Sequence, residues 1–136
     1  MKKGIYISIK PKYTKLIENK TKNYEFRKYI PKKGVDILYV YESFPTCELK
    51  YIIEVNNILK YPEKITKEGY GNDEFNNGLK QSKYAYEIFK VYKLKNPLPL
   101  KTLKEKYNFN APQSYAYDEK YIELTKYIMN CDKIKI

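Results

Sequence analysis

Three charged side chains in the stretch ENKTKNYEFRK (residues 18–28) have the types and spacing of a binding site. Arg27 is the only arginine of the 136-residue chain, in which every other basic residue is lysine. A guanidinium group can hold a carboxylate, a phosphate or a guanine edge through two parallel hydrogen bonds, which an ammonium group cannot do. Arg27 is therefore a candidate binding residue, and Glu25 and Lys22 add an acceptor and a second cation close by.

A strand must position two of these groups. Residues 23–30 alternate in the manner of a β-strand, which places Glu25 and Arg27 on one face, about 7 Å apart. Tyr24 and Phe26 then lie on the opposite face. An alternative stays open: Glu25 and Arg27 form a buried ion pair that stabilises the sheet.

The other elements follow from hydrophobic spacing and from turn residues. Residues 4–10 alternate as a half-buried strand, and Pro11 begins a helix that Asn19 ends in the left-handed conformation. Further strands are predicted at 35–42, 49–59 and 84–94, and Pro97 and Pro99 mark an edge after the last of them. A helix is expected behind Pro99, with Leu100, Leu103 and Tyr107 on one face. A last helix is expected over 118–130, with Asp118 as its cap. Residues 61–82 are polar and turn-rich, which is typical of a lid, a variable insertion or a loop without a functional role.

This order of elements predicts an α+β class: a small mixed β-barrel of five to six strands with flanking helices. The length suits one domain over 1–136. Within it we expect 96–136, which contains the late helices, to be a helical C-terminal extension packed on the barrel, and the resemblance described below supports this expectation.

Composition narrows the function. A formal net charge of +11 favours a polyanionic partner, most commonly nucleic acid, although an acidic small molecule, a membrane surface or simple solvation also fits. The chain has no histidine, which excludes histidine-based nucleophile systems and metal sites. Cys47 and Cys131 lie far apart, as in a cytoplasmic protein with reduced thiols. We expect no metal, no cofactor, no signal peptide and no membrane span.

The segment Lys20-Thr21-Lys22-Asn23-Tyr24-Glu25-Phe26-Arg27 resembles the G-x-K-x-x-E-x-R signature of ASCH domains, which belong to the PUA-like barrel group. The preceding strand-Pro-helix opening ISIKPKYTKLI strengthens this resemblance, which is best over residues 4–60. It implies that Lys22, Glu25 and Arg27 line a cleft for RNA or a nucleotide-derived ligand. Lys20 departs from the family's glycine, so Asn19 is expected to make the turn.

Some ASCH relatives are amidohydrolases acting on an acetylated cytidine, or ribonucleases. The amidohydrolase branch has a threonine nucleophile where this chain has Glu25, with a lysine at the position of Lys22. The missing threonine argues against that particular activity and leaves another hydrolysis open.

Several other residues are candidates for the same ligand. Lys10 and Lys12 flank the start of the first helix, where amide groups favour an anion, and together with Lys20 they suit a phosphate backbone. Gln113, Tyr115 and Tyr117 precede the last helix and suit base stacking and edge recognition, or simply packing of the loop. Glu54 is a candidate general base or an ordinary strand glutamate.

The leading hypothesis is an RNA- or modified-nucleotide-binding domain with a basic cleft at Lys22, Glu25 and Arg27. The alternative is a small metal-independent hydrolase of nucleosides or RNA that uses Lys22 with Glu25 or Glu54. A regulatory module that binds an acidic protein surface is a third possibility. The sequence leaves catalysis, the identity of the ligand and the oligomeric state undetermined.

Overall fold

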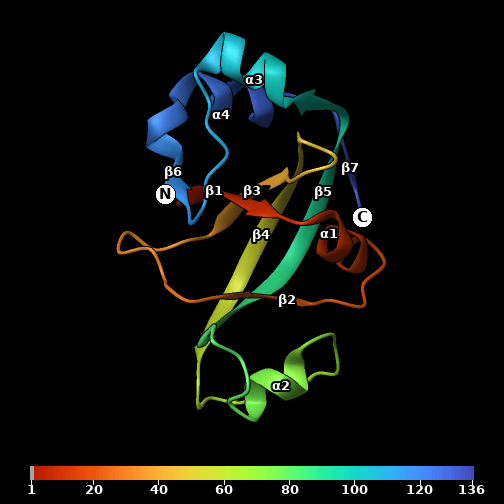
Figure 1. Ribbon diagram of the computed structural model, residues 1–136, viewed down its shortest axis with the longest axis vertical. Helices are drawn as coiled ribbons and strands as arrows, with labels where there is room; N and C mark the ends of the chain where they lie inside the picture. Colours follow the sequence, from red (N-terminus) through yellow and green to blue (C-terminus); the bar gives the residue numbers. More distant parts are fainter. Residues whose placement is uncertain (1) are drawn as a thin grey trace.

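One mixed β-sheet forms the frame of the protein, and the computed structural model describes residues 2–136. Its strands are β1 (Gly4–Ile9), β2 (Tyr24–Arg27), β3 (Ile37–Glu42), β4 (Glu48–Lys60), β5 (Tyr84–Pro99), β6 (Ala116–Tyr117) and β7 (Lys133–Lys135). The strand order is β2-β5-β4-β3-β1-β6, and β7 pairs with β5. The sheet curls so that β2 crosses in front of the long strands β4 and β5 (Figure 1).

Helices flank this sheet. They are α1 (Pro11–Glu18), α2 (Asn72–Asn76), α3 (Leu100–Tyr107) and α4 (Ile122–Met129), with a 3-10 turn over Asp118–Tyr121. Helices α3 and α4 lie together at one end of the molecule, and α2 lies at the opposite end (Figure 1). The predicted α+β class with a small barrel-like mixed sheet is confirmed, and the short strands β6 and β7 add to the strands expected from the sequence.

Both faces of β1 are buried. Ile5 and Ile7 pack into a core cluster on one face, while Tyr6, with 0% of its surface exposed, packs into a second cluster on the other. Leu103 of α3 and Leu124 of α4 belong to this second cluster. The predicted half-buried strand is therefore wrong in this respect, because the C-terminal helices cover the face that was expected to meet solvent.

The first helix begins as predicted, at Pro11, but its end differs from the prediction. Asn19 has a φ of −86°, and Lys20 adopts the left-handed conformation with a φ of 68°. The position at which the ASCH signature has glycine is thus left-handed in this chain, although a lysine occupies it. The backbone N–H of Lys20 donates to the carbonyl of Ile17 (3.1 Å), as in common helix C-terminal motifs.

The C-terminal part departs from the sequence prediction in two places. Strand β5 continues to Pro99, so Pro97 and Pro99 lie within its last residues. Asp118 begins a 3-10 turn and does not cap the following helix with its side chain; its carboxylate accepts a hydrogen bond from the backbone N–H of Gly4 (3.2 Å). The side chain of Asp118 thus contacts a residue far away in the sequence instead of capping the helix that follows it.

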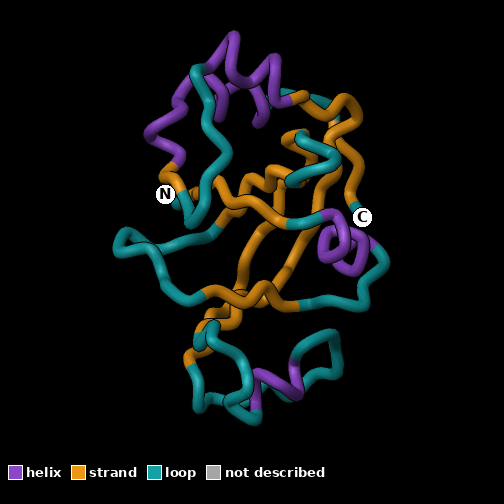
Figure 2. Tube along the Cα trace, in the orientation of Figure 1, coloured by secondary structure: helices purple, strands orange, loops and turns teal. Residues whose placement is uncertain are grey.

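The segment 61–82 is mainly loop around the short helix α2 (Figure 2). It is not loosely attached, because Ile65 and Phe75 form a small buried cluster with Tyr24 and Ala85 of the sheet. This cluster places the segment beside β2, which carries the candidate site.

Candidate functional site

The turn between α1 and β2 positions Lys22. Its backbone N–H donates to the carbonyl of Leu16 (2.9 Å), which fixes the chain as it leaves the helix. Its side chain is directed inward, only 5% of the residue is exposed, and Nζ donates to the carbonyl of Tyr24 (2.7 Å). Lysine is rarely buried to this degree without a partner, and Glu25 supplies one at 3.4 Å.

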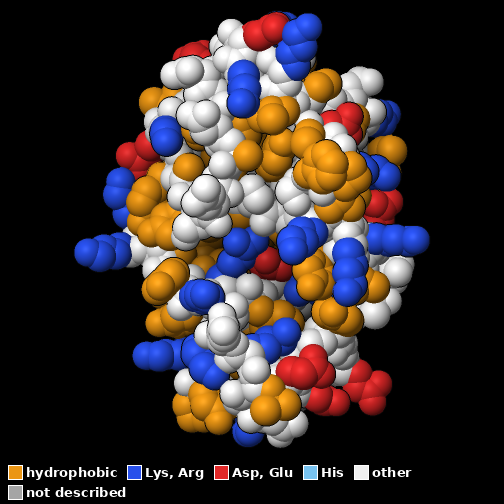
Figure 3. All heavy atoms as spheres, viewed as in Figure 1, with side chains coloured by type: hydrophobic (Ala, Val, Ile, Leu, Met, Phe, Trp, Pro, Cys, Tyr) orange, Lys and Arg blue, Asp and Glu red, His pale blue; other side chains and the backbone are white. Residues whose placement is uncertain are grey.

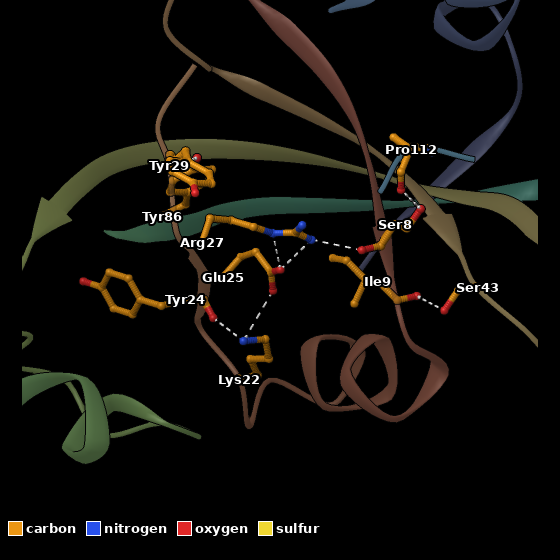
Figure 4. A network of polar contacts seen from close by, with 10 residues as sticks. All are labelled: Ser8, Ile9, Lys22, Tyr24, Glu25, Arg27, Tyr29, Ser43, Tyr86 and Pro112. Atoms are coloured by element: carbon orange, nitrogen blue, oxygen red, sulfur yellow. Dashed lines mark hydrogen bonds and ion pairs between the residues drawn. The ribbon is translucent and has the colours of Figure 1, made fainter. Parts of the chain in front are cut away.

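Glu25 lies between two cations. Its Oε1 atom is 3.4 Å from Nζ of Lys22. Its Oε2 atom accepts a hydrogen bond from Nε of Arg27 (2.8 Å) and forms an ion pair with Nη2 of the same side chain (2.8 Å; Figure 4). The strand spacing predicted that Glu25 and Arg27 share a face, and the contact between them agrees with it. The side chain of Glu25 is only 9% exposed, so its charge acts mainly on these two side chains.

Arg27 also reaches a strand that is not its neighbour in the sheet. Its Nη2 atom donates to the carbonyl of Ser8 on β1 (3.0 Å; Figure 4), whereas β2 pairs only with β5 within the described residues. One guanidinium group thus connects the end strand β2 to β1 across the curled sheet. The ion pair that the sequence left as an alternative is present, together with this additional contact.

Burial lowers the pKa of Lys22 below its usual value, because the ammonium group has lost most of its water. The carboxylate of Glu25 opposes this shift, whereas the positive charges of Lys80 and Arg27 add to it. The ammonium group is consequently easier to deprotonate than that of an ordinary surface lysine.

Two adjoining cavities border this cluster. The cavity that we call the arginine cavity has a volume of about 390 Å³ and is lined by Arg27, Tyr29, Tyr86, Gln113 and Tyr115, among others. The lysine cavity has a volume of about 220 Å³ and is lined by Tyr13, Lys22, Glu25, Tyr70 and Lys80, among others. Phe26 and Ser82 line both cavities, which shows that the two adjoin.

The segment 61–82 supplies a wall that the sequence did not assign to the site. Tyr70, Lys80 and Ser82 line the lysine cavity. The backbone N–H of Tyr70 donates to the carbonyl of Thr21 (2.9 Å), which fixes the segment on the turn before Lys22. The sequence had no local signal for this contact, since Tyr70 stands between turn glycines and the contact is made through backbone atoms.

The other predicted site residues divide into three groups. Gln113 and Tyr115 line the arginine cavity together with Arg27, as the leading hypothesis expects. Tyr117 packs edge-on against Tyr115 at 5.4 Å between ring centres, and its hydroxyl accepts from the backbone N–H of Lys33 (3.3 Å). Its contacts in the structure are therefore those of packing.

The remaining predicted residues are not among the described residues that line either cavity. These are Lys10, Lys12, Lys20 and Glu54. The three lysines are exposed, and Glu54 on β4 pairs with Lys2 at 3.3 Å. Their roles in binding or catalysis stay predictions.

Basic side chains gather over the middle of one face, between the main part of the sheet and the α2 end (Figure 3). A second charged cluster lies on another side of α1, where buried Glu42 accepts from Thr14 and pairs with Lys50 at 3.4 Å. In this second cluster Lys50 is the counter-ion of Glu42.

Two further observations concern residues 2–136. No group of three or more His, Cys, Asp or Glu side chains there is arranged to hold a metal ion. Within the same residues, no helix combines the length and the apolar character needed to cross a membrane.

The fold is that of solved ASCH domain structures. The ASCH protein from Zymomonas mobilis superposes with a TM-score of 0.70 over 95% of this chain and 96% of its own, at 20% identity. Two variants of that protein, one with tyrosine replaced by phenylalanine and one with serine replaced by alanine, also match at 20% identity. They give TM-scores of 0.72 (96% of this chain, 100% of theirs) and 0.69 (93% and 96%).

No protein-family model and no curated protein matches the chain by sequence. The resemblance that the sequence motif indicated is thus confirmed as a likeness of fold.

Proposed function

We propose that this protein binds RNA or a nucleotide-derived ligand in the cleft formed by the arginine and lysine cavities. The observation that carries the proposal is that Lys22 and Arg27 both contact the single carboxylate Glu25, with Lys80 lining the same cavity, beside a second cavity lined by aromatic rings. The ASCH-like fold and the net charge of +11 support it.

The arginine cavity has the chemistry that recognition of an unpaired base requires. Tyr115 and Tyr29 offer ring faces for stacking, and Gln113 offers an amide that can donate to or accept from a base edge. Its volume of about 390 Å³ lies within the range of small-molecule sites, roughly 300–1,000 Å³. Peripheral lysines add affinity that depends on salt.

The first test measures binding of single-stranded RNA, duplex RNA and duplex DNA by fluorescence anisotropy at two salt concentrations. Wild type and Arg27→Lys are compared, and the recovered RNA is analysed for cleavage. We expect single-stranded RNA to bind most tightly and binding to weaken at the higher salt concentration. We expect Arg27→Lys to bind about tenfold more weakly, because an ammonium group cannot form the two parallel hydrogen bonds with which a guanidinium group holds a phosphate or a base edge.

The control variant Lys101→Gln removes an exposed charge on α3, at the end of the molecule remote from α2, and should change the affinity much less. Urea unfolding of each variant separates a loss of binding from a loss of fold. Equal affinity of wild type and Arg27→Lys would contradict the role given to Arg27, and no binding of any nucleic acid would contradict the proposal itself.

A second candidate function rests on the buried state of Lys22. A desolvated lysine with a lowered pKa beside a glutamate has the properties of a nucleophile or a base, which favours a metal-independent hydrolase of nucleosides or RNA. Glu25 is the glutamate that contacts Lys22, and Glu54 pairs with Lys2. New products in the mixtures above that disappear with Lys22→Met would favour this function over simple binding.

A further inference from the structure

The lysine cavity has more positive than negative charge. Lys22 and Lys80 both lie over the ring of Phe26, with Nζ at 4.6 Å and 4.5 Å from its centre. Glu25 is the one carboxylate among the described residues that line the cavity, and its two oxygens contact Lys22 and Arg27. Within the described part of the chain, Lys80 forms no ion pair.

This arrangement has an electrostatic cost in the free protein. The charge of Lys80 contributes to the lowered pKa of Lys22, which means that the two ammonium groups repel each other. An anion placed between them would relieve this repulsion, and it would meet the Ser82 hydroxyl that lines the same cavity. The carboxylate of Glu25 opposes an anion less than a free carboxylate would, because both its oxygens already contact cations.

The sizes of the two cavities suit two parts of one ligand. The lysine cavity, about 220 Å³, has room for a phosphate group, and the arginine cavity, about 390 Å³, has room for a base and its sugar. Because Phe26 and Ser82 border both cavities, the two parts of the ligand would be directly connected.

We propose that the lysine cavity is a phosphate site, and that the ligand unit is a single nucleotide whose base and sugar occupy the arginine cavity. This inference rests on the proposed function. It implies an unstacked or terminal nucleotide, because a base inside a duplex cannot enter a cavity without leaving its neighbours. In this arrangement Lys80 contacts the phosphate, and it can do so because the segment 61–82 packs against the site.

The test is calorimetric titration of the folded protein with adenosine, cytidine and their 5′- and 3′-monophosphates. Wild type, Lys80→Gln and Ser82→Ala are compared, with Lys101→Gln as the matched control for loss of one positive charge. We expect at least one monophosphate to bind wild type about tenfold or more tightly than its nucleoside, and Lys80→Gln to remove most of this difference while the nucleoside affinity stays unchanged.

Three results would overturn the inference. Equal affinity of wild type for nucleoside and monophosphate would show that the phosphate makes no favourable contact, and the proposed binding function would still stand. An equal loss of both affinities in Lys80→Gln, with an unchanged urea midpoint, would show that Lys80 acts through packing. No binding of either ligand, together with absence of RNA binding in the anisotropy experiment, would remove the proposed function as well.

Discussion

The guanidinium of Arg27 contacts Glu25 on its own strand and the carbonyl of Ser8 on β1. Its status as the only arginine indicated that a forked donor matters at this position. The partner on β1 could not be predicted, because a backbone carbonyl has no residue signature and the two strands meet only through the curl of the sheet. The contact of Arg27 with Glu25 was predictable, because alternate residues of a strand lie on the same face.

The left-handed Lys20 gives a prediction for stability. A side chain with a Cβ atom is strained at a φ of 68°, whereas glycine is not. We expect Lys20→Gly to raise the free energy of unfolding by about 0.5–1 kcal/mol, after part of the gain is offset by the flexibility of glycine in the unfolded chain. Urea unfolding monitored by circular dichroism measures the change.

The control for this variant is Lys15→Gly, within α1, which should lower stability by about 1 kcal/mol because glycine is a poor helix former there. A loss of stability of the same size in both variants would show that the turn conformation is not the source of strain at Lys20.

At the scale of elements, regular strands and the first helix were predictable from spacing and from Pro11. The packing of 61–82 was not, because it depends on long-range contacts such as that of Asn72 with Asn23 (2.9 Å). Asp118 was expected to act locally and instead contacts Gly4, far away in the sequence. The division at residue 96 stays a prediction; β6 and β7, which lie beyond it, pair with β1 and β5.

Gly71 controls how closely the segment 61–82 approaches the site. It has a φ of 81°, and a Cβ atom added there would lie 2.9 Å from Cε2 of Phe26 and 3.1 Å from Nζ of Lys80. We expect Gly71→Ala to lower the free energy of unfolding by about 1–3 kcal/mol, through backbone strain and through the crowding of Phe26. Urea unfolding is the measurement.

Gly34→Ala is the matched control, because Gly34 has a similar φ of 86° but no atom within 4 Å of an added Cβ. The difference between the two variants isolates the cost of crowding. If both variants lose the same stability, the crowding of Phe26 does not contribute to the loss, and the prediction that close packing at Gly71 matters for the two cavities would be wrong.

For the whole molecule, the many tyrosines give a pH dependence. Burial raises the pKa of Tyr39 to about 12 and that of Tyr86 to about 12, and it also raises the pKa values of Tyr6, Tyr41 and Tyr51. A tyrosine whose pKa is higher in the folded than in the unfolded state stabilises the fold fully below pH 10, and this contribution is lost as the pH rises toward the folded value. The lowered pKa of Lys22 acts in the opposite direction but is a single group.

We therefore expect the free energy of unfolding to fall steeply between pH 10 and pH 12, by up to about 1.4 kcal/mol per pH unit for each such tyrosine. Urea unfolding at pH 8, 10 and 11 measures this fall, and Tyr39→Phe should make it less steep. A free energy of unfolding that is constant from pH 8 to 11 would contradict this role of the buried tyrosines. A pH dependence of that free energy that is unchanged in Tyr39→Phe would contradict the contribution of Tyr39.

The overall class was predictable because alternation, turn residues and helical stripes agree along most of the chain. The burial of both faces of β1 was not, since it follows from where the helices α3 and α4 pack. The net charge predicted an anionic partner, but only the folded arrangement places Lys22 and Arg27 on one carboxylate, with Lys80 lining the same cavity.

The position of β1 has a consequence for the order in which the chain can fold. This strand is made before both of its partners, β3 and β6, and residues 116–117 of β6 follow it by more than a hundred positions. Pairing of distant segments slows folding, because the loop must close before the contacts form. The edge of β1 that pairs with β6 therefore stays unpaired until residues 116–117 have been made, and until then it can pair with a wrong segment or with another chain.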